Sequence, residues 1–165
     1  AKEHGYQLRT VEACVAVNAD QKTRLFEKAK DRMISFSGLK VAVLGLTFKA
    51  GTDDLREAPS IDNIKLLLEN GADIYAFDPK GVDRAKQIFP EGKLDKGTMN
   101  YVSSPKEALT GANICFVFTE WKDIKEVTPK QFKEWMHTPL VYDGRNLYSL
   151  DEMEECKVEY YSIGR

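Results

Sequence analysis

Several cationic and aromatic side chains directly follow short apolar runs of the sequence. They are Phe48, Lys49 and Arg56 after the run 40–46, Trp121 after the run 114–118, and Arg145 after the run 140–142. Cations hold phosphate groups by charge-assisted hydrogen bonds, and flat rings offer a surface to a planar base. Residues of these types are therefore what a protein needs to hold a diphosphate beside a base and a sugar.

Carboxylates occupy equivalent places in the pattern. Glu120 and Asp143 follow the runs 114–118 and 140–142, and both can accept hydrogen bonds from a ligand. Simpler roles stay open, since Lys49 and Arg56 also fit a solvated loop and Trp121 also fits an ordinary core. These residues predict an anion site, but they do not identify the ligand or the reaction.

The turn after the first apolar run lacks the glycines that usually hold a dinucleotide. Gly45-Leu46-Thr47-Phe48 does not continue as G-x-G-x-x-G, and no G-K-[ST] motif follows it. Backbone contacts from a glycine-rich loop are therefore not expected here. A side-chain cation, Lys49, would have to take over that role.

The elements that position these residues alternate between strand and helix. Strands are expected at 40–46, 73–77, 114–118, 140–142 and 158–163, with a short one at 101–102, and helices are expected to begin at Pro59, Val82, Pro105 and Pro129. Such alternation implies right-handed crossovers between parallel strands. We predict an α/β fold with a Rossmann-like parallel sheet of about five or six strands and helices on both faces.

A long amphipathic helix is expected to precede this sheet. Apolar residues recur at three- and four-residue steps through residues 1–35, namely Leu8, Val11, Val15, Leu25, Ala29 and Met33. Its apolar stripe must pack on the following domain, on sequence outside this chain, or on another subunit. The sequence starts at Ala1 without an initiating Met, so we expect a fragment boundary there.

Composition excludes several classes of protein. The 24 basic and 26 acidic residues give a net charge of -2. The chain therefore lacks the excess of basic residues that favours binding to nucleic acid or to an anionic membrane. The apolar runs are too short to cross a bilayer. Cys14, Cys115 and Cys156 are widely spaced and odd in number, which argues against a disulfide framework or a zinc site and fits a reducing cytoplasm.

Several ordered motifs resemble the C-terminal, UDP-binding domain of the UDP-glucose/GDP-mannose dehydrogenase family. They are the segments 41–60, 77–79, 119–121, 143–146 and 163–165. Residues 17–21 are similar to the end of the family's long central helix, which forms its dimer interface. The resemblance therefore implies a division into residues 1–36, the end of the dimerisation helix, and residues 37–165, a UDP-binding Rossmann-like domain.

The resemblance also implies an activity for the complete enzyme. The family oxidises carbon 6 of a UDP-sugar twice, reduces two NAD, and captures the aldehyde on a cysteine thiol. It implies that Phe48, Lys49 and Arg145 contact the UDP-sugar and that Arg56 reaches the NAD held mainly by an N-terminal domain. Pocket-shaping roles are implied for Glu120, Trp121 and Asp143.

The family's catalytic cysteine lies in a Gly-Gly-Ser-Cys type segment, which Cys14 does not match. No catalytic residue is therefore expected in this chain, which should bind a UDP-sugar weakly and not convert it. The motifs look most like the UDP-glucose branch, and the complete enzyme is expected to be a homodimer. A UDP-N-acetylhexosamine or GDP-mannose dehydrogenase, or a non-catalytic nucleotide-binding or dimerisation module, are the alternatives.

Overall fold

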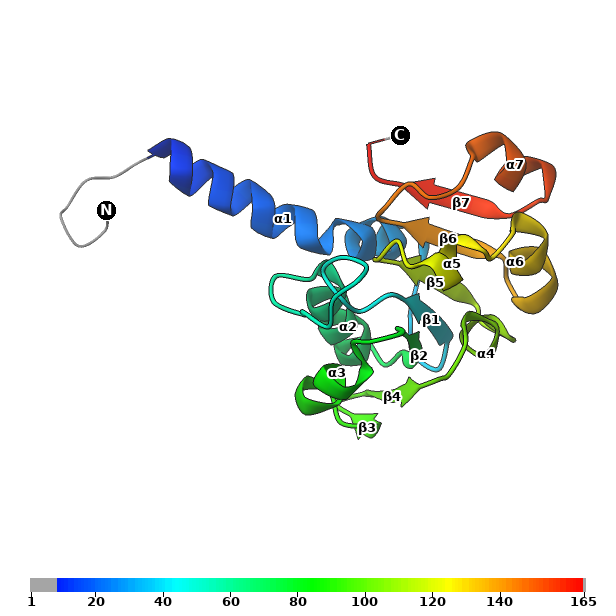
Figure 1. Ribbon diagram of the computed structural model, residues 1–165, viewed down its shortest axis with the longest axis horizontal. Coiled ribbons are helices and arrows are strands. Elements are labelled where there is room, and N and C mark those ends of the chain that lie inside the picture. Colours follow the sequence, from blue (N-terminus) through cyan, green and yellow to red (C-terminus); the bar gives the residue numbers. More distant parts are fainter. Residues whose placement is uncertain (1–8, 165) are drawn as a thin grey trace.

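The computed structural model describes the backbone of residues 9–164 and the side chains of residues 21–164. Across these residues a seven-stranded sheet has the order β3-β4-β2-β1-β5-β6-β7 (Figure 1). The strands are β1 (Lys40–Leu44), β2 (Asp73–Phe77), β3 (Gly92–Leu94), β4 (Gly97–Tyr101), β5 (Ile114–Val117), β6 (Leu140–Asp143) and β7 (Glu159–Ser162). All neighbours pair in parallel except β3 and β4. The predicted Rossmann-like α/β fold is confirmed.

Helices cover both faces of the sheet. One apolar core lies between the sheet and α1 (Arg9–Arg32), α2 (Pro59–Glu69) and α3 (Val82–Ile88). The other lies under α4 (Pro105–Leu109), α5 (Lys122–Lys125), α6 (Pro129–Trp135) and α7 (Leu150–Glu155). Three helices begin at the predicted prolines, because proline at the first helical position needs no hydrogen-bond acceptor. The short helices α5 and α7 were not predicted.

The hairpin β3–β4 was not predicted, because the only strand expected in this region was the short one at 101–102. Asp95 has a φ of 54° and lies in the two-residue turn between the strands, where Leu94 pairs with Gly97. Gly97 is placed so that a Cβ would lie 2.2 Å from the carbonyl oxygen of Ala72. The segment 92–100 is polar and Gly- and Lys-rich, so no apolar alternation marked it as strand.

The second half of α1 packs on the sheet domain, which was one of the three expected outcomes for its apolar stripe. Leu25, Phe26 and Ala29 are buried in the same core as the sheet. The backbone N–H of Phe26 donates to Asn63 Oδ1 at 3.1 Å, and Lys28 Nζ donates to the Ser162 carbonyl at 2.6 Å. Leu8 and the side chains of Val11 and Val15 lie outside the described residues. The division at residues 36 and 37 stays a prediction.

Asp78 ties together the ends of three strands at the carboxyl edge of the sheet. Its Oδ2 accepts hydrogen bonds from the backbone N–H groups of Leu46 and Thr47, from the Thr47 hydroxyl and from the indole N–H of Trp121, at 2.7 to 3.1 Å. Its Oδ1 accepts from the N–H groups of Lys80 and Gly81. This buried carboxylate therefore fixes how the chain leaves β1, β2 and β5.

Gly45 lets the segments that follow β1 and β5 approach each other. Its φ is 88°, and a Cβ placed on it would lie 2.5 Å from the Cβ of Thr119 and 2.7 Å from the Thr119 backbone nitrogen. The Thr119 hydroxyl donates to the Thr47 carbonyl across the same gap. Any larger residue at position 45 would push the two strand ends apart.

We predict that Asp78→Asn lowers the free energy of unfolding by about 2–4 kcal/mol. The amide NH₂ would replace either Oδ1 or Oδ2, and at both places it would face N–H donors that need an oxygen acceptor. Asp73→Asn is the matched control, since Asp73 lies at the other end of β2, where its carboxylate accepts a hydrogen bond from the Thr98 hydroxyl. Chemical denaturation of both variants checks this. Equal losses in the two variants would contradict the role given to Asp78.

Gly45→Ala and Gly51→Ala should differ sharply in stability, although both glycines have a φ of 88°. A Cβ at Gly51 meets nothing within 4 Å, so that variant carries only the backbone strain of about 1–2 kcal/mol. Gly45→Ala adds the clash with Thr119 and should cost at least about 2 kcal/mol more. Unfolding midpoints in urea measure the difference, and similar midpoints would contradict a close approach at Gly45.

Candidate functional site

The order of the strands reverses beside β1, the first strand along the chain. β2 and β4 lie on one side of it, and β5, β6 and β7 lie on the other. In open α/β sheets ligands bind outside the carboxyl ends of the strands at such a switch point. The segments that leave β1, β5 and β6 there are residues 45–58, 118–121 and 144–147. They carry all the predicted site residues except Asp143, which ends β6.

The segment 45–58 after β1 forms a closed loop. The backbone N–H of Phe48 donates to the carbonyl of Asp54 at 2.9 Å. The side chains of Phe48 and Lys49 are exposed near the start of this loop. An exposed aromatic ring beside an exposed cation is available for contact with a ligand.

Two adjoining depressions connect Phe48 to Arg145. The first has a volume of about 290 Å³ and is lined by Gln21, Lys22, Phe48, Glu57 and Pro59. The second is narrower and shares Gln21, Lys22 and Pro59 with the first, adding Leu25, Phe118, Gly144, Arg145 and Ile163. We call these two depressions together the strand-end groove. The groove runs between α1 and the loops that follow β1, β5 and β6.

Arg145 is held in this groove by the buried carboxylate of Asp143. Asp143 is fully buried at the end of β6, and its Oδ1 accepts from the backbone N–H of Arg145 at 2.7 Å. Its Oδ2 accepts from the N–H of Leu147 at 2.7 Å and from the Tyr160 hydroxyl at 2.8 Å. Asp143 therefore shapes the turn that presents Arg145 and is not itself offered to a ligand.

Carboxylates from neighbouring segments pair with the cations of the groove. Glu120 binds the guanidinium of Arg145 through both Nε and Nη2, and both residues also line an adjoining depression of about 390 Å³. Glu57 pairs with the ammonium of Lys22 on α1. The cations thus lie within reach of a ligand but already have partners.

Trp121 lies beneath the strand ends. Its side chain is buried in the second core, and its indole N–H donates to Thr47 Oγ1 at 3.1 Å and to Asp78 Oδ2 at 3.0 Å. It supports the loop after β1 from below, which agrees with the simpler interpretation of Trp121 as core. A direct place for it in the wall of a pocket stays a prediction.

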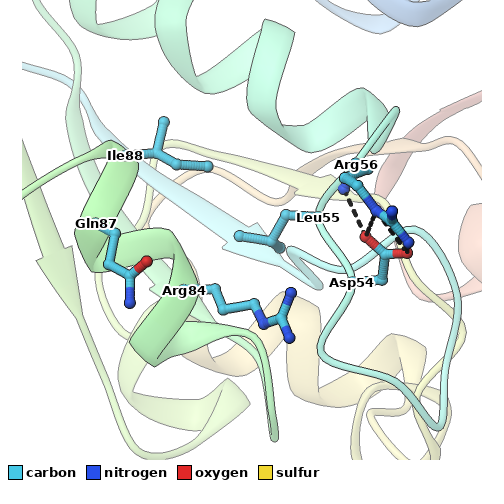
Figure 2. Close-up of a pocket in the computed structure, with 6 residues that line it drawn as sticks. All are labelled: Asp54, Leu55, Arg56, Arg84, Gln87 and Ile88. Carbon is cyan, nitrogen blue, oxygen red and sulfur yellow. Dashed lines mark hydrogen bonds and ion pairs between the residues drawn. The ribbon is translucent and has the colours of Figure 1, made fainter.

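Arg56 lines a separate depression, between the loop after β1 and α3. This hollow has a volume of about 490 Å³ and is lined by Asp54, Leu55, Arg56, Arg84, Gln87 and Ile88 (Figure 2). The Arg56 side chain is 87% exposed and binds the Asp54 carboxylate, with Nη2 2.8 Å from Oδ2. Hydrogen bonds from the Arg56 side chain and backbone hold the pKa of Asp54 well below its usual range. Arg84 pairs with Asp53 at 2.7 Å.

Three of the predicted site residues line two separate hollows, whereas Lys49 is not among the residues that line either one. Phe48 and Arg145 line the strand-end groove, and Arg56 lines the hollow against α3. Sequence reasoning missed Lys22 and Arg84. Both lie on helices among many other charged residues, and no spacing signal separates them from a solvated helix face.

Other kinds of site find no support in the described part of the chain. Within it, no three His, Cys, Asp or Glu side chains come together as a metal site. Cys115 is fully buried, and burial raises the pKa of its thiol well above the ordinary value, so it cannot act as a ready nucleophile. Among the described helices none combines the length and apolar character that crossing a membrane requires.

The sequence was compared with known protein families and proteins. Residues 42–150 match the model of the UDP-glucose/GDP-mannose dehydrogenase family, UDP binding domain. The chain is 39% identical to the UDP-glucose 6-dehydrogenase YwqF of Bacillus subtilis over 99% of its own length and 35% of the relative. It is 37% identical to a UDP-glucose 6-dehydrogenase of Pseudomonas aeruginosa over 100% of this chain and 36% of the relative.

A solved structure agrees with these relatives. The UDP-glucose dehydrogenase of Pyrobaculum islandicum superposes with a TM-score of 0.77 at 26% identity, over 96% of this chain and 33% of that one. The chain thus spans about a third of the length of the proteins it matches. It belongs to the UDP-glucose/GDP-mannose dehydrogenase family, and it corresponds to the UDP binding domain of that family.

Proposed function

We propose that this chain holds the UDP part of UDP-glucose in the strand-end groove, as a portion of a UDP-glucose 6-dehydrogenase. The complete enzyme would oxidise carbon 6 of the sugar to a carboxylate and reduce two NAD⁺. The observation that carries this proposal is that Phe48 and Arg145, which are far apart in sequence, line one groove beside the switch point of the sheet. The names of the relatives support glucose as the sugar.

Each side chain of the groove has a chemical role in this proposal. Arg145 binds the diphosphate, because a guanidinium matches two phosphate oxygens with two parallel N–H groups. The exposed ring of Phe48 packs against the nucleotide, and Lys49 beside it adds a positive charge. When the phosphate binds, the ion pair between Glu120 and Arg145 either breaks or is kept, with the guanidinium bound to both anions.

The hollow lined by Arg56 and Arg84 lies on the other side of the loop after β1, and we assign it to the coenzyme. The side chain of Arg56 is more exposed than those of Asp54 and Arg84, and the apolar residues Leu55 and Ile88 line the same hollow (Figure 2). A hollow with an exposed cation and apolar lining suits a dinucleotide bound mainly by another domain. This placement would bring NAD and UDP-sugar to opposite sides of one loop.

Assembly and location complete the proposal. The first half of α1 extends beyond the sheet in Figure 1, which supports a role for this helix in joining two subunits of the complete enzyme. Cys115 and Cys156 are free thiols, as is usual in the reducing cytoplasm. The chain alone would bind nucleotide without turning it over, because the nucleophilic cysteine and the NAD fingerprint belong to the rest of the enzyme.

Calorimetric titration of UDP into this chain at low salt tests the assignment. Arg145→Ala and Lys49→Ala should each weaken binding on the order of tenfold, since each removes a charge-assisted phosphate contact worth roughly 1.5–3 kcal/mol. Lys93→Ala is the control, because Lys93 is an exposed lysine on β3 at the opposite edge of the sheet. Equal affinities for all variants would remove the UDP site from the groove.

Arg56→Ala should separate the two hollows. In the complete dehydrogenase it should raise the KM for NAD⁺ on the order of tenfold, because a charge-assisted contact is lost, while the affinity of this chain for UDP stays unchanged. Lys130→Ala, an exposed lysine on α6, should change neither quantity. A loss of UDP affinity with no change in KM for NAD⁺ would reverse the assignment of Arg56.

A further inference from the structure

Lys22 of α1 lies where the two depressions of the strand-end groove meet. It lines the depression that holds Phe48 and also the narrower one that holds Arg145. A ligand that touches both Phe48 and Arg145 must therefore pass over Lys22. No motif in the sequence marks this residue, and the proposed function above does not use it.

The surroundings of Lys22 differ from those of an ordinary surface lysine. Its side chain is only 24% exposed, so it has lost most of its contact with water, whereas the side chain of its partner Glu57 is 78% exposed. The backbone beneath it is also fixed, because the Lys22 carbonyl accepts from Asn63 Nδ2 at 2.6 Å. The ammonium is thus held in the groove by the fold, while the carboxylate reaches it from solvent.

Glu57 approaches from the loop that also carries Phe48. Its φ is 60°, a left-handed conformation that costs a residue with a Cβ about 1–2 kcal/mol. The residues before it, Leu55 and Arg56, line the other hollow, so Glu57 is the point at which the chain turns toward the groove. A carboxylate placed this way offers Lys22 the same kind of oxygen acceptor that a phosphate would offer.

The geometry points to Lys22 as a further cation of the nucleotide-sugar site, with Glu57 as an internal counter-ion that the ligand's phosphate replaces. This inference rests on the proposed function, because it concerns the same groove and the same diphosphate. Exchange is favoured since the displaced Glu57 side chain is already mostly hydrated, while the phosphate carries more charge and more acceptor oxygens. Arg145 and Glu120 repeat this arrangement at the other end of the groove.

Two variants with opposite expected effects test the inference by calorimetric titration of UDP into this chain. Lys22→Gln should weaken UDP binding on the order of tenfold, because a desolvated phosphate contact is lost. Glu57→Gln should tighten it about two- to fivefold, the range expected for removing a competing exposed ion pair. In the Lys22→Gln background the Glu57→Gln change should have no effect, as a double-mutant cycle requires of a pair that acts together.

Lys30→Gln is the matched control, because it removes the same charge from an exposed position of the same helix and should leave UDP affinity unchanged. Thermal unfolding of each variant checks that the fold is kept, and the gain expected from Glu57→Gln cannot arise from unfolding.

If Arg145→Ala loses UDP but both Lys22→Gln and Glu57→Gln bind like the parent, this inference is wrong and the proposed function stands. If Glu57→Gln weakens binding, the counter-ion role is wrong. If the parent does not bind UDP, or if Arg145→Ala binds it as well as the parent, both proposals fall.

Discussion

The carboxylate of Asp78 is the interaction on which the strand ends depend. It accepts hydrogen bonds from the backbone N–H groups that follow β1 and from those of the turn after β2. It also accepts from the indole N–H of Trp121, which follows β5. Burying a charge costs free energy unless hydrogen-bond donors surround it. Here the donors are backbone N–H groups, the Thr47 hydroxyl and the indole N–H of Trp121. Because the same oxygen serves β1 and β5, the loops on the two sides of the switch point keep a fixed spacing. The shape of the groove above them follows from that spacing.

Charge is arranged at this edge of the sheet so that cations are available without being left alone. Four cations that line hollows are each paired with a carboxylate, in the pairs Lys22–Glu57, Arg145–Glu120, Arg56–Asp54 and Arg84–Asp53. The pairs offset the mutual repulsion of the cations and limit the freedom of their long side chains. Most of these ions are at least partly exposed, so the pairs add little to stability. Their value lies in orientation: a guanidinium already held flat loses less entropy when a second anion joins it.

The sequence predicts the fold well because its strongest signals are also the ones that determine the core. Val41–Leu44 is buried on both faces, as its continuous apolar run implies, and prolines mark the first turns of α2, α4 and α6. The hairpin β3–β4 escaped prediction because an edge strand can be polar and its pairing depends on a neighbour. The site was only partly predictable for a similar reason. Residues that directly follow a strand could be named, but Lys22 joins the groove through the docking of α1, a contact between segments distant in the chain.

The attachment of α1 to the end of the chain bears on how the protein is made. Lys28 and Arg32 of this helix bind the Ser162 carbonyl and the Glu159 carboxylate of β7, and Leu25 lies against the backbone near Gly144. In proteins most of the stability of a helix comes from packing its apolar face on a surface. During synthesis α1 leaves the ribosome before the strands of the sheet, and its partners on β7 lie 127 and 134 residues further along the chain. The helix therefore waits for nearly the whole domain to be translated before its packing is complete, and a stalled or shortened product would carry it undocked, with its apolar side chains open to chaperones.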